Sequence, residues 1–207
     1  MYSVVRLYKM KSTKDIDKVV DATRNGFLPI VTKAPGFIAY TMALAADGEL
    51  VTIGFFEDRA GADESTRLAA GWVRDNVAWS VEGPPKIAEG EVRIQERRGE
   101  DASYGVLRRV KLQPGKSNEA LELMRTKMVP MLASLPGFSR VAVFESGPDE
   151  LLSLAAWRDR ASAEEATRQA MAFMQANAGD LVAGPPEMID AEIKLRHVNE
   201  AALQQSR

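Results

Sequence analysis

The chain has 207 residues, of which 45% are hydrophobic and 27% are charged, and it contains no cysteine. These proportions are usual for globular proteins, and the lack of cysteine excludes disulfides, thiolate nucleophiles and cysteine-based zinc sites. The net charge is −2 with both signs mixed, which argues against nucleic-acid binding. No apolar stretch approaches the roughly 18 residues of a membrane span, so we expect a cytoplasmic protein that does not enter a membrane.

The sequence repeats itself at a constant offset of 101 residues, as 135 − 34, 157 − 56 and 184 − 83 show. The recurring blocks are Ala34–Phe37 with Leu135–Phe138, Phe56–Ala60 with Trp157–Ala161, and Gly83–Pro85 with Gly184–Pro186. Because the spacing holds across three separated blocks, the halves must share one fold rather than one motif. We expect domains at residues 1–98 and 102–199, each of common domain size, and a C-terminal tail at 200–207.

The first half is expected to run strand, helix, hairpin, helix, strand. Apolar residues recur at helical spacing between Ile16 and Ile30, and Pro29 inside this stretch should kink the helix or restart it. The turn Asp47-Gly48 predicts a hairpin. The strands are predicted at Ser3–Met10, Phe37–Leu44, Leu50–Phe56 and about Glu89–Glu96.

The second half repeats this order, with Pro130 in the place of Pro29. Its second helix is expected to begin with a capping box at Ser162–Glu165. The first copy has Gly61 in place of Ser162, which predicts a weaker cap. The strands are predicted at Gly105–Leu112, Phe138–Glu145, Leu151–Trp157 and Ala191–Arg196.

The resulting order, β-α-β-β-α-β in each half, is the ferredoxin-like arrangement of the α+β class, with both helices on one face of an antiparallel sheet. The strands carry apolar residues on both faces, as in Val4, Val5 and Leu7. The face without helices must therefore be buried as well, and the nearest candidate to cover it is the other half.

The Pro-Gly-Phe strand start, the Asp-Gly-Glu hairpin, the Phe-Glu-Asp-Arg-Ala helix start and the Ala-Gly-Trp-Val helix segment of the first half resemble antibiotic biosynthesis monooxygenase (ABM) domains of the dimeric α+β barrel superfamily. The resemblance runs in two copies from Ser3 to about His197. It implies two sheets that face each other in an intrachain dimeric α+β barrel. The chain would then be a pseudo-dimer, and further homodimerisation stays open.

The candidate site residues lie mainly on the second helices. At 100° per residue, Trp72, Asn76 and Trp79 share a stripe, and Phe173 and Asn177 occupy the matching positions of the second half. The rings could line a cavity for a flat aromatic ligand while the amides hydrogen-bond its oxygen. Alternatively, the rings cover the edge of the sheet and the amides cap the chain, and we favour this reading because aromatic stripes are more often core.

Relatives suggested by the resemblance use Asn and Trp on this helix to activate electron-rich phenols without a cofactor. The resemblance therefore implies Asn76 and Trp72 as catalytic residues. The substrate-binding candidates are Trp79, Tyr40, Arg6, Phe173, Asn177 and Arg108. The two arginines are expected to face the barrel interior and orient an anion. Asp180 stands where the first half has Trp79, so we expect at most the first half to be active.

Other chemistry has little support. His197 is the only histidine, so no metal site can be completed around it, and the second helices lack the axial histidine of haem-degrading relatives. No phosphate-binding glycine motif is present, so we expect no cofactor. Three hypotheses stay open: a cofactor-independent monooxygenase acting on a small aromatic or polyketide-like phenol, a non-catalytic ligand-binding or sensing protein, and a solid barrel that acts through its surface.

Overall fold

The computed structural model describes residues 1–99 and 102–205, which form two compact units. The first unit is Met1–Glu91 together with the chain from Ile193 onward, and the second is Val92–Glu192. In the described residues, no helix is long and apolar enough to cross a membrane.

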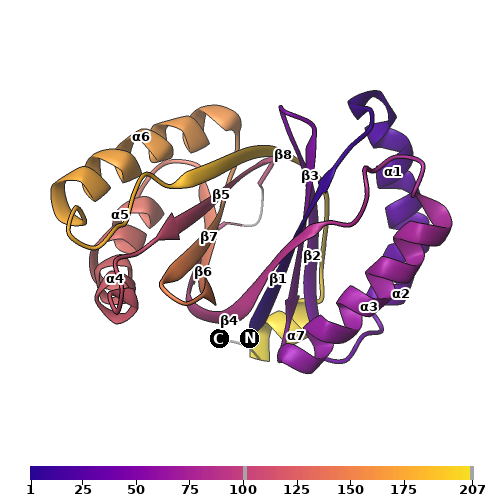
Figure 1. Ribbon diagram of the computed structural model, residues 1–207, viewed down its shortest axis with the longest axis horizontal. Coiled ribbons are helices and arrows are strands. Elements are labelled where there is room, and N and C mark those ends of the chain that lie inside the picture. Colours follow the sequence, from indigo (N-terminus) through magenta and orange to yellow (C-terminus); the bar gives the residue numbers. More distant parts are fainter. Residues whose placement is uncertain (100–101, 206–207) are drawn as a thin grey trace. The chain divides into compact units, whose positions relative to one another are not determined.

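In the first unit, the helices of residues 16–31 and 59–76 cover one face of the sheet (Figure 1). Its strands are β1 (Tyr2–Lys9), β2 (Phe37–Ala45), β3 (Glu49–Phe56) and the first part of β4 (Lys86–Arg97). The first helical segment consists of η1 (Thr13–Asp15), α1 (Ile16–Ala22), the π-helical turn η2 (Thr23–Phe27) and α2 (Leu28–Val31). The second helix is α3 (Arg59–Asn76), and α7 (Glu200–Gln205) lies within the predicted tail, of which residues 206–207 are outside the described residues.

The second unit repeats these elements in the same order. Its strands are β5 (Tyr104–Lys111), β6 (Phe138–Gly147), β7 (Glu150–Trp157) and the first part of β8 (Glu187–Val198). Its helices are α4 (Ser117–Leu123), the π-helical turn η3 (Met124–Met128), α5 (Val129–Ala133) and α6 (Arg160–Asn177). The long helices α3 and α6 begin 101 residues apart (160 − 59), as the sequence offset predicts.

The hydrogen-bonded strand order is β1-β3-β2-β8-β5-β7-β6-β4, and it closes on itself as a barrel. The central ladders are antiparallel and register-matched between the units, since Arg6 pairs with Thr52 in the first and Arg108 with Ser153 in the second. The predicted α+β class, the two βαββαβ copies and the antiparallel barrel are therefore confirmed.

Each unit has a core between its sheet and its helices. The first contains Val4, Phe27 and Phe56, and the second contains Val143 and Trp157. Strand residues of the opposite face, which belong to neither core, are buried too: Val5, Leu7, Ile38, Phe144 and Leu152. The expectation that both faces of the strands are buried is confirmed.

Both first helices change their hydrogen-bond register immediately before a proline. The amide of Leu28 donates to the carbonyl of Thr23, five residues earlier, and Val129 donates likewise to Met124. Pro29 and Pro130, which have no amide hydrogen to continue the α-helical ladder, come next. The expected restart of the helix at these prolines is confirmed, and it takes the form of a π-helical turn.

The predicted capping box at Ser162 is wrong. The cap of α6 is Asp159, whose carboxylate accepts from the Ser162 amide at 2.8 Å, and Asp58 caps α3 in the same way through Gly61 at 3.0 Å. Both helices therefore begin earlier than expected and have equivalent caps. The Asp159 carboxylate accepts hydrogen bonds from the Ser162 amide, the Ser162 hydroxyl and Arg158, which lower its pKa to about 2.

Candidate functional site

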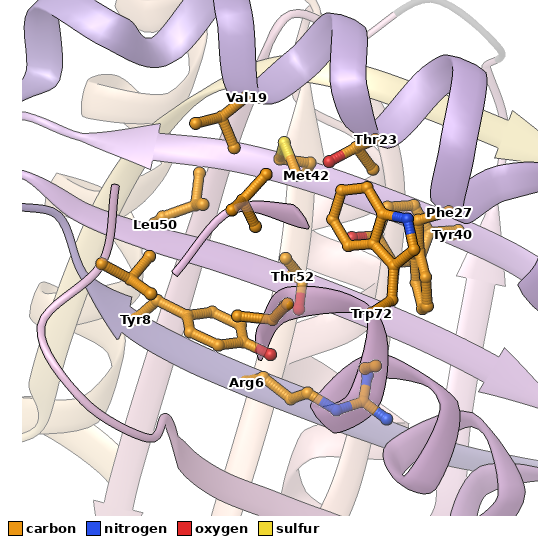
Figure 2. A pocket seen from close by; sticks show the side chains of 14 residues that line it. Arg6, Tyr8, Val19, Thr23, Phe27, Tyr40, Met42, Leu50, Thr52 and Trp72 are labelled. Atoms are coloured by element: carbon orange, nitrogen blue, oxygen red, sulfur yellow. The ribbon is translucent and has the colours of Figure 1, made fainter. Parts of the chain in front are cut away.

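A small cavity lies between the sheet and the helices of the first unit (Figure 2). Its volume is about 30 Å³, which is room for about two water molecules. Its polar lining comes from three strands and the first helical segment: Arg6, Tyr8, Thr23, Tyr40 and Thr52. The ring of Trp72 closes one side beside Phe27 and Tyr40 (Figure 2).

Arg6 is a buried cation whose hydrogen-bond partners are neutral. It is 2% exposed, and its Nη2 donates to Ser65 Oγ at 2.8 Å and to Thr66 Oγ1 at 2.6 Å. Its Nε has no partner, and among residues 1–99 and 102–205 no carboxylate forms an ion pair with it. Burial lowers the pKa of Arg6, although a guanidinium stays protonated at any ordinary pH. The charge of Glu89 partly opposes this lowering without forming an ion pair with Arg6. The cavity wall therefore holds a positive charge that no described carboxylate contacts directly.

The expectation that Arg6 and Arg108 face the barrel interior is wrong. Arg6 reaches the helix α3 of its own unit, and Arg108 reaches α6, where its Nη2 donates to Thr167 Oγ1 at 2.6 Å. In a strand, alternate residues point to opposite faces, so Tyr8 lies on the same face as Arg6. The structure thus turns Arg6 toward the helix layer, as in Figure 2, where the Tyr8 ring also extends toward Arg6.

The two tyrosines supply neutral hydroxyl groups. Burial raises the pKa of Tyr40 well above its ordinary value, and Tyr40 shares a hydrogen bond with Thr52. Burial likewise raises the pKa of Tyr8, while the charge of Arg6 partly opposes this. Because both phenols stay protonated, they offer hydrogen bonds without bringing a negative charge to Arg6.

Three aromatic rings form a connected wall. Phe27 packs edge-to-face on Tyr40 with centroids 5.6 Å apart, and its centroid lies 5.5 Å from that of Trp72. Trp72 is only partly buried, and it lies against the backbone of Gly26, where a Cβ atom would come within 3.0 Å of its indole nitrogen. The glycine in the π-helical turn therefore makes room for the indole.

Four predicted site residues do not line the cavity. The Asn76 amide donates to the Trp72 carbonyl at 2.9 Å, and Asn177 donates to the Phe173 carbonyl at 2.9 Å, so each is an exposed group that closes the end of its own helix. Trp79 is 47% exposed and donates to the Asn76 carbonyl at 3.1 Å. Phe173 packs against the core of the second unit. Of the candidates, Arg6, Tyr40 and Trp72 come together in the first unit.

The cavity is also formed by residues that were not predicted from the sequence. Thr23 is 1% exposed, and its hydroxyl lines the cavity without a protein partner. Tyr8 lies two residues after Arg6 in the same strand, so the alternation of strand residues could have placed both on one face. Phe27 and Gly26 lie in the π-helical turn, a feature frequent at functional sites, and the sequence did not reveal that turn.

The described residues contain no group of three or more His, Cys, Asp or Glu side chains that could hold a metal ion. His197 is exposed, and its ring centroid lies 6.0 Å from that of Phe37. The chemistry of the cavity therefore depends on the charged and polar side chains of its wall.

Residues 103–177 match the family described as antibiotic biosynthesis monooxygenase. The second unit thus contains a segment that matches the ABM family. No protein of curated function matches the chain. The resemblance inferred from the sequence is therefore confirmed over this segment, and the first unit has the same order of strands and helices as the ABM segment.

Solved structures share the fold over nearly the whole chain. A presumed monooxygenase from Fusobacterium nucleatum is 13% identical with a TM-score of 0.76, covering 96% of this chain and 94% of that one. A presumed monooxygenase from Lactobacillus acidophilus NCFM is 11% identical with a TM-score of 0.73, covering 96% and 97%. An anthrone oxidase-like protein is 16% identical with a TM-score of 0.65, covering 95% and 92%. At these identities the likeness concerns the fold.

Proposed function

We propose that the first unit is a cofactor-independent monooxygenase site that binds a small aromatic phenol as its anion and oxidises it with molecular oxygen. The observation that carries this proposal is the buried Arg6, which faces an aromatic-lined cavity and donates its hydrogen bonds to neutral hydroxyls, with no carboxylate of the described residues in direct contact. A phenolate oxygen would supply the missing negative charge. Charge-assisted hydrogen bonds of this kind are shorter and stronger than neutral ones.

The remaining polar groups suit the same ligand. Thr23 has a hydroxyl without a protein partner, and Tyr8 is a neutral phenol, so both can hydrogen-bond an oxygen atom held by Arg6. The rings of Phe27, Tyr40 and Trp72 offer stacking or edge contacts to a flat ligand, each worth about 1 kcal/mol. A flat anion is therefore favoured over a neutral or non-planar molecule.

A ligand of this size requires the cavity to open. Its 30 Å³ holds about two water molecules, far less than an aromatic ring needs. Trp72 is the partly exposed one of the three aromatic rings, so turning its side chain outward would open the cavity and leave the buried sheet residues in place. Access would then be controlled by one side chain rather than by a loop.

The reaction would use electrons from the substrate itself. An anthrone, ionised to its phenolate form, is electron-rich at the carbon opposite the oxygen. Molecular oxygen adds at this carbon, two C–H bonds are lost, a second carbonyl forms, and the other oxygen atom leaves as water. The substrate loses four electrons and oxygen gains four. Arg6 would stabilise the anion from which the electrons leave, and the dry wall would orient it.

A second candidate is a protein that binds a phenol without turning it over. It is favoured by the lack, in the described lining, of a group that titrates near neutral pH, since Tyr8 and Tyr40 have raised pKa values and Arg6 stays charged. Such a site can hold a phenolate but cannot easily take its proton. The two candidates share the ligand and differ in turnover.

Oxygen consumption distinguishes them. Anthrone is added to the full chain in buffer that contains a metal chelator, and oxygen uptake is compared with the anthraquinone formed. The monooxygenase proposal expects one oxygen molecule per anthraquinone and a rate that falls at least tenfold in Arg6→Met, while the matched Arg108→Met variant keeps it. Saturable binding with the uncatalysed rate of oxygen uptake would favour the binding protein instead.

A further inference from the structure

The second unit has its own cavity between sheet and helices, and the chemistry of its wall is different. Its volume is about 50 Å³, room for about four water molecules, so it exceeds that of the first. Arg108 is the charged residue on its described wall and is 7% exposed. Aliphatic side chains form nearly all of the rest, and no aromatic ring is part of this lining.

The repeat shows which residues have changed. With an offset of 102 in the first strand and 101 elsewhere, four aromatic or hydroxyl residues of the first wall are replaced by aliphatic ones, while Trp72 corresponds to Phe173, which is not part of the second lining. Tyr8 becomes Val110, Thr23 becomes Met124, Phe27 becomes Met128, and Tyr40 becomes Val141. Arg6 and Thr52 remain as Arg108 and Ser153. The charge is thus kept while the wall is changed from rigid rings to flexible chains.

Arg108 has fewer hydrogen bonds than Arg6. Its Nη2 donates to Thr167, but Ala166 stands where Ser65 provides the second hydroxyl of the first unit. Its Nε has no partner, and no ion pair with it is formed by the residues that the structure describes. Burial lowers the pKa of Arg108, while the exposed Asp190 opposes this from a distance. The guanidinium stays charged and keeps free donors beside the cavity.

Four of the nine methionines of the chain line this cavity. They are Met124, Met128, Met171 and Met174. Unbranched thioether side chains fill irregular gaps and rearrange around different occupants, as they do on promiscuous binding surfaces. The wall can therefore adapt to an alkyl chain longer than the resting cavity would hold.

We infer that this second cavity binds a short aliphatic carboxylate, with the carboxylate on Arg108 and the alkyl chain among the methionines. The planar guanidinium matches a carboxylate through two parallel hydrogen bonds, for which Nε and a terminal nitrogen are the usual pair. The lack of ring partners disfavours an aromatic ligand here. This inference does not rest on the proposed oxidation in the first unit.

Methionine methyl groups give a direct readout. The full chain, labelled with ¹³C at the methionine methyls, is titrated with hexanoate and separately with hexan-1-ol. We expect hexanoate to shift the signals of Met124, Met128, Met171 and Met174 and to leave Met42, on the wall of the first cavity, unchanged. Hexan-1-ol, which lacks the charge, should bind at least about tenfold more weakly.

The Arg108→Gln variant supplies the second arm, with Arg6→Gln as its matched control. Loss of the hexanoate shifts in Arg108→Gln, together with their retention in Arg6→Gln, would support the inference. Equal affinity for hexan-1-ol in the unaltered chain, shifts confined to Met42, or no saturable shift would each overturn it. The comparison of the two ligands needs no variant, so it holds even if Arg108→Gln fails to fold.

Discussion

Replacing Arg6 by methionine tests whether this residue serves ligand binding or the stability of the fold. Methionine is unbranched and uncharged, so it replaces the aliphatic stem of Arg6 and its flexible thioether can fill part of the space that the guanidinium leaves. The change removes two hydrogen bonds from a charged donor, each worth about 1.5–3 kcal/mol, but it also removes the cost of burying a cation, which is several kcal/mol. The two effects nearly cancel.

The partners of Arg6 lose little. Ser65 and Thr66 also donate to the Ala62 carbonyl, at 2.9 and 3.1 Å, so their hydroxyl hydrogens stay bonded after the substitution. We therefore expect the free energy of unfolding of Arg6→Met to lie within about 2 kcal/mol of the original or above it. For a chain of this size, that is a change in Tm of no more than about 8 °C downward.

Thermal unfolding with and without a phenol such as 1-naphthol measures both quantities. We expect the Tm of Arg6→Met without ligand to fall by no more than about 8 °C, and we expect the variant to lose the stabilisation that the phenol gives the original chain. Arg108→Met, the matched variant in the second unit, should keep that stabilisation. A fall in Tm of more than about 12 °C without ligand would mean that Arg6 holds the fold together, and the reasoning would be refuted.

The other predictions concern the helix ends. Asn76→Ala and Asn177→Ala should each lower the free energy of unfolding by about 1 kcal/mol or less, because each amide donates to a carbonyl of its own helix. A fluorescence titration should show unchanged phenol binding in both variants. Weaker binding in Asn76→Ala alone would mean that Asn76 belongs to the site. Gly61→Ser should lower the free energy of unfolding by about 1–3 kcal/mol, because a Cβ at this position would lie 2.2 Å from the Pro35 carbonyl oxygen. An unchanged midpoint of urea unfolding would contradict this prediction. Asp159 has a pKa of about 2 when folded, below its ordinary 3.8, so its stabilising effect is full above about pH 4 and is lost as the pH falls toward about 2. Asp159→Asn should therefore lose less stability than the original chain between about pH 5 and about pH 2, and an equal loss would argue against the cap.

The order of the strands could be predicted because their signals are local, although β4 (Lys86–Arg97) and β8 (Glu187–Val198) extend further at both ends than predicted. Turn residues such as Asp47-Gly48 and runs of β-branched residues mark each strand, and the repeat doubles every signal. The cap of α6 was missed because Asp159 and Ser162 are both good capping residues, and backbone geometry decides between them.

The site was only partly predictable for two physical reasons. The helical stripe was extended to Trp79, but α3 ends at Asn76, and Val77 already has a non-helical φ of −131°, so the spacing of 100° per residue no longer applies there. Arg6 lies on a strand with apolar residues on both faces, so the sequence could not show which face the helices cover. Both facts depend on tertiary packing.

The protonation state of a bound phenol tests most directly whether Arg6 makes the first cavity a phenolate site. The absorption spectrum of 1-naphthol, which differs between phenol and phenolate, is followed against pH with the full chain in excess, and with Arg6→Met and Arg108→Met. We expect the pKa of the bound phenol to be lower than in water for the original chain and for Arg108→Met, because a nearby cation favours the anion, and we expect this lowering to be lost in Arg6→Met. A bound phenol whose pKa is raised, or a lowering that persists in Arg6→Met, would contradict it.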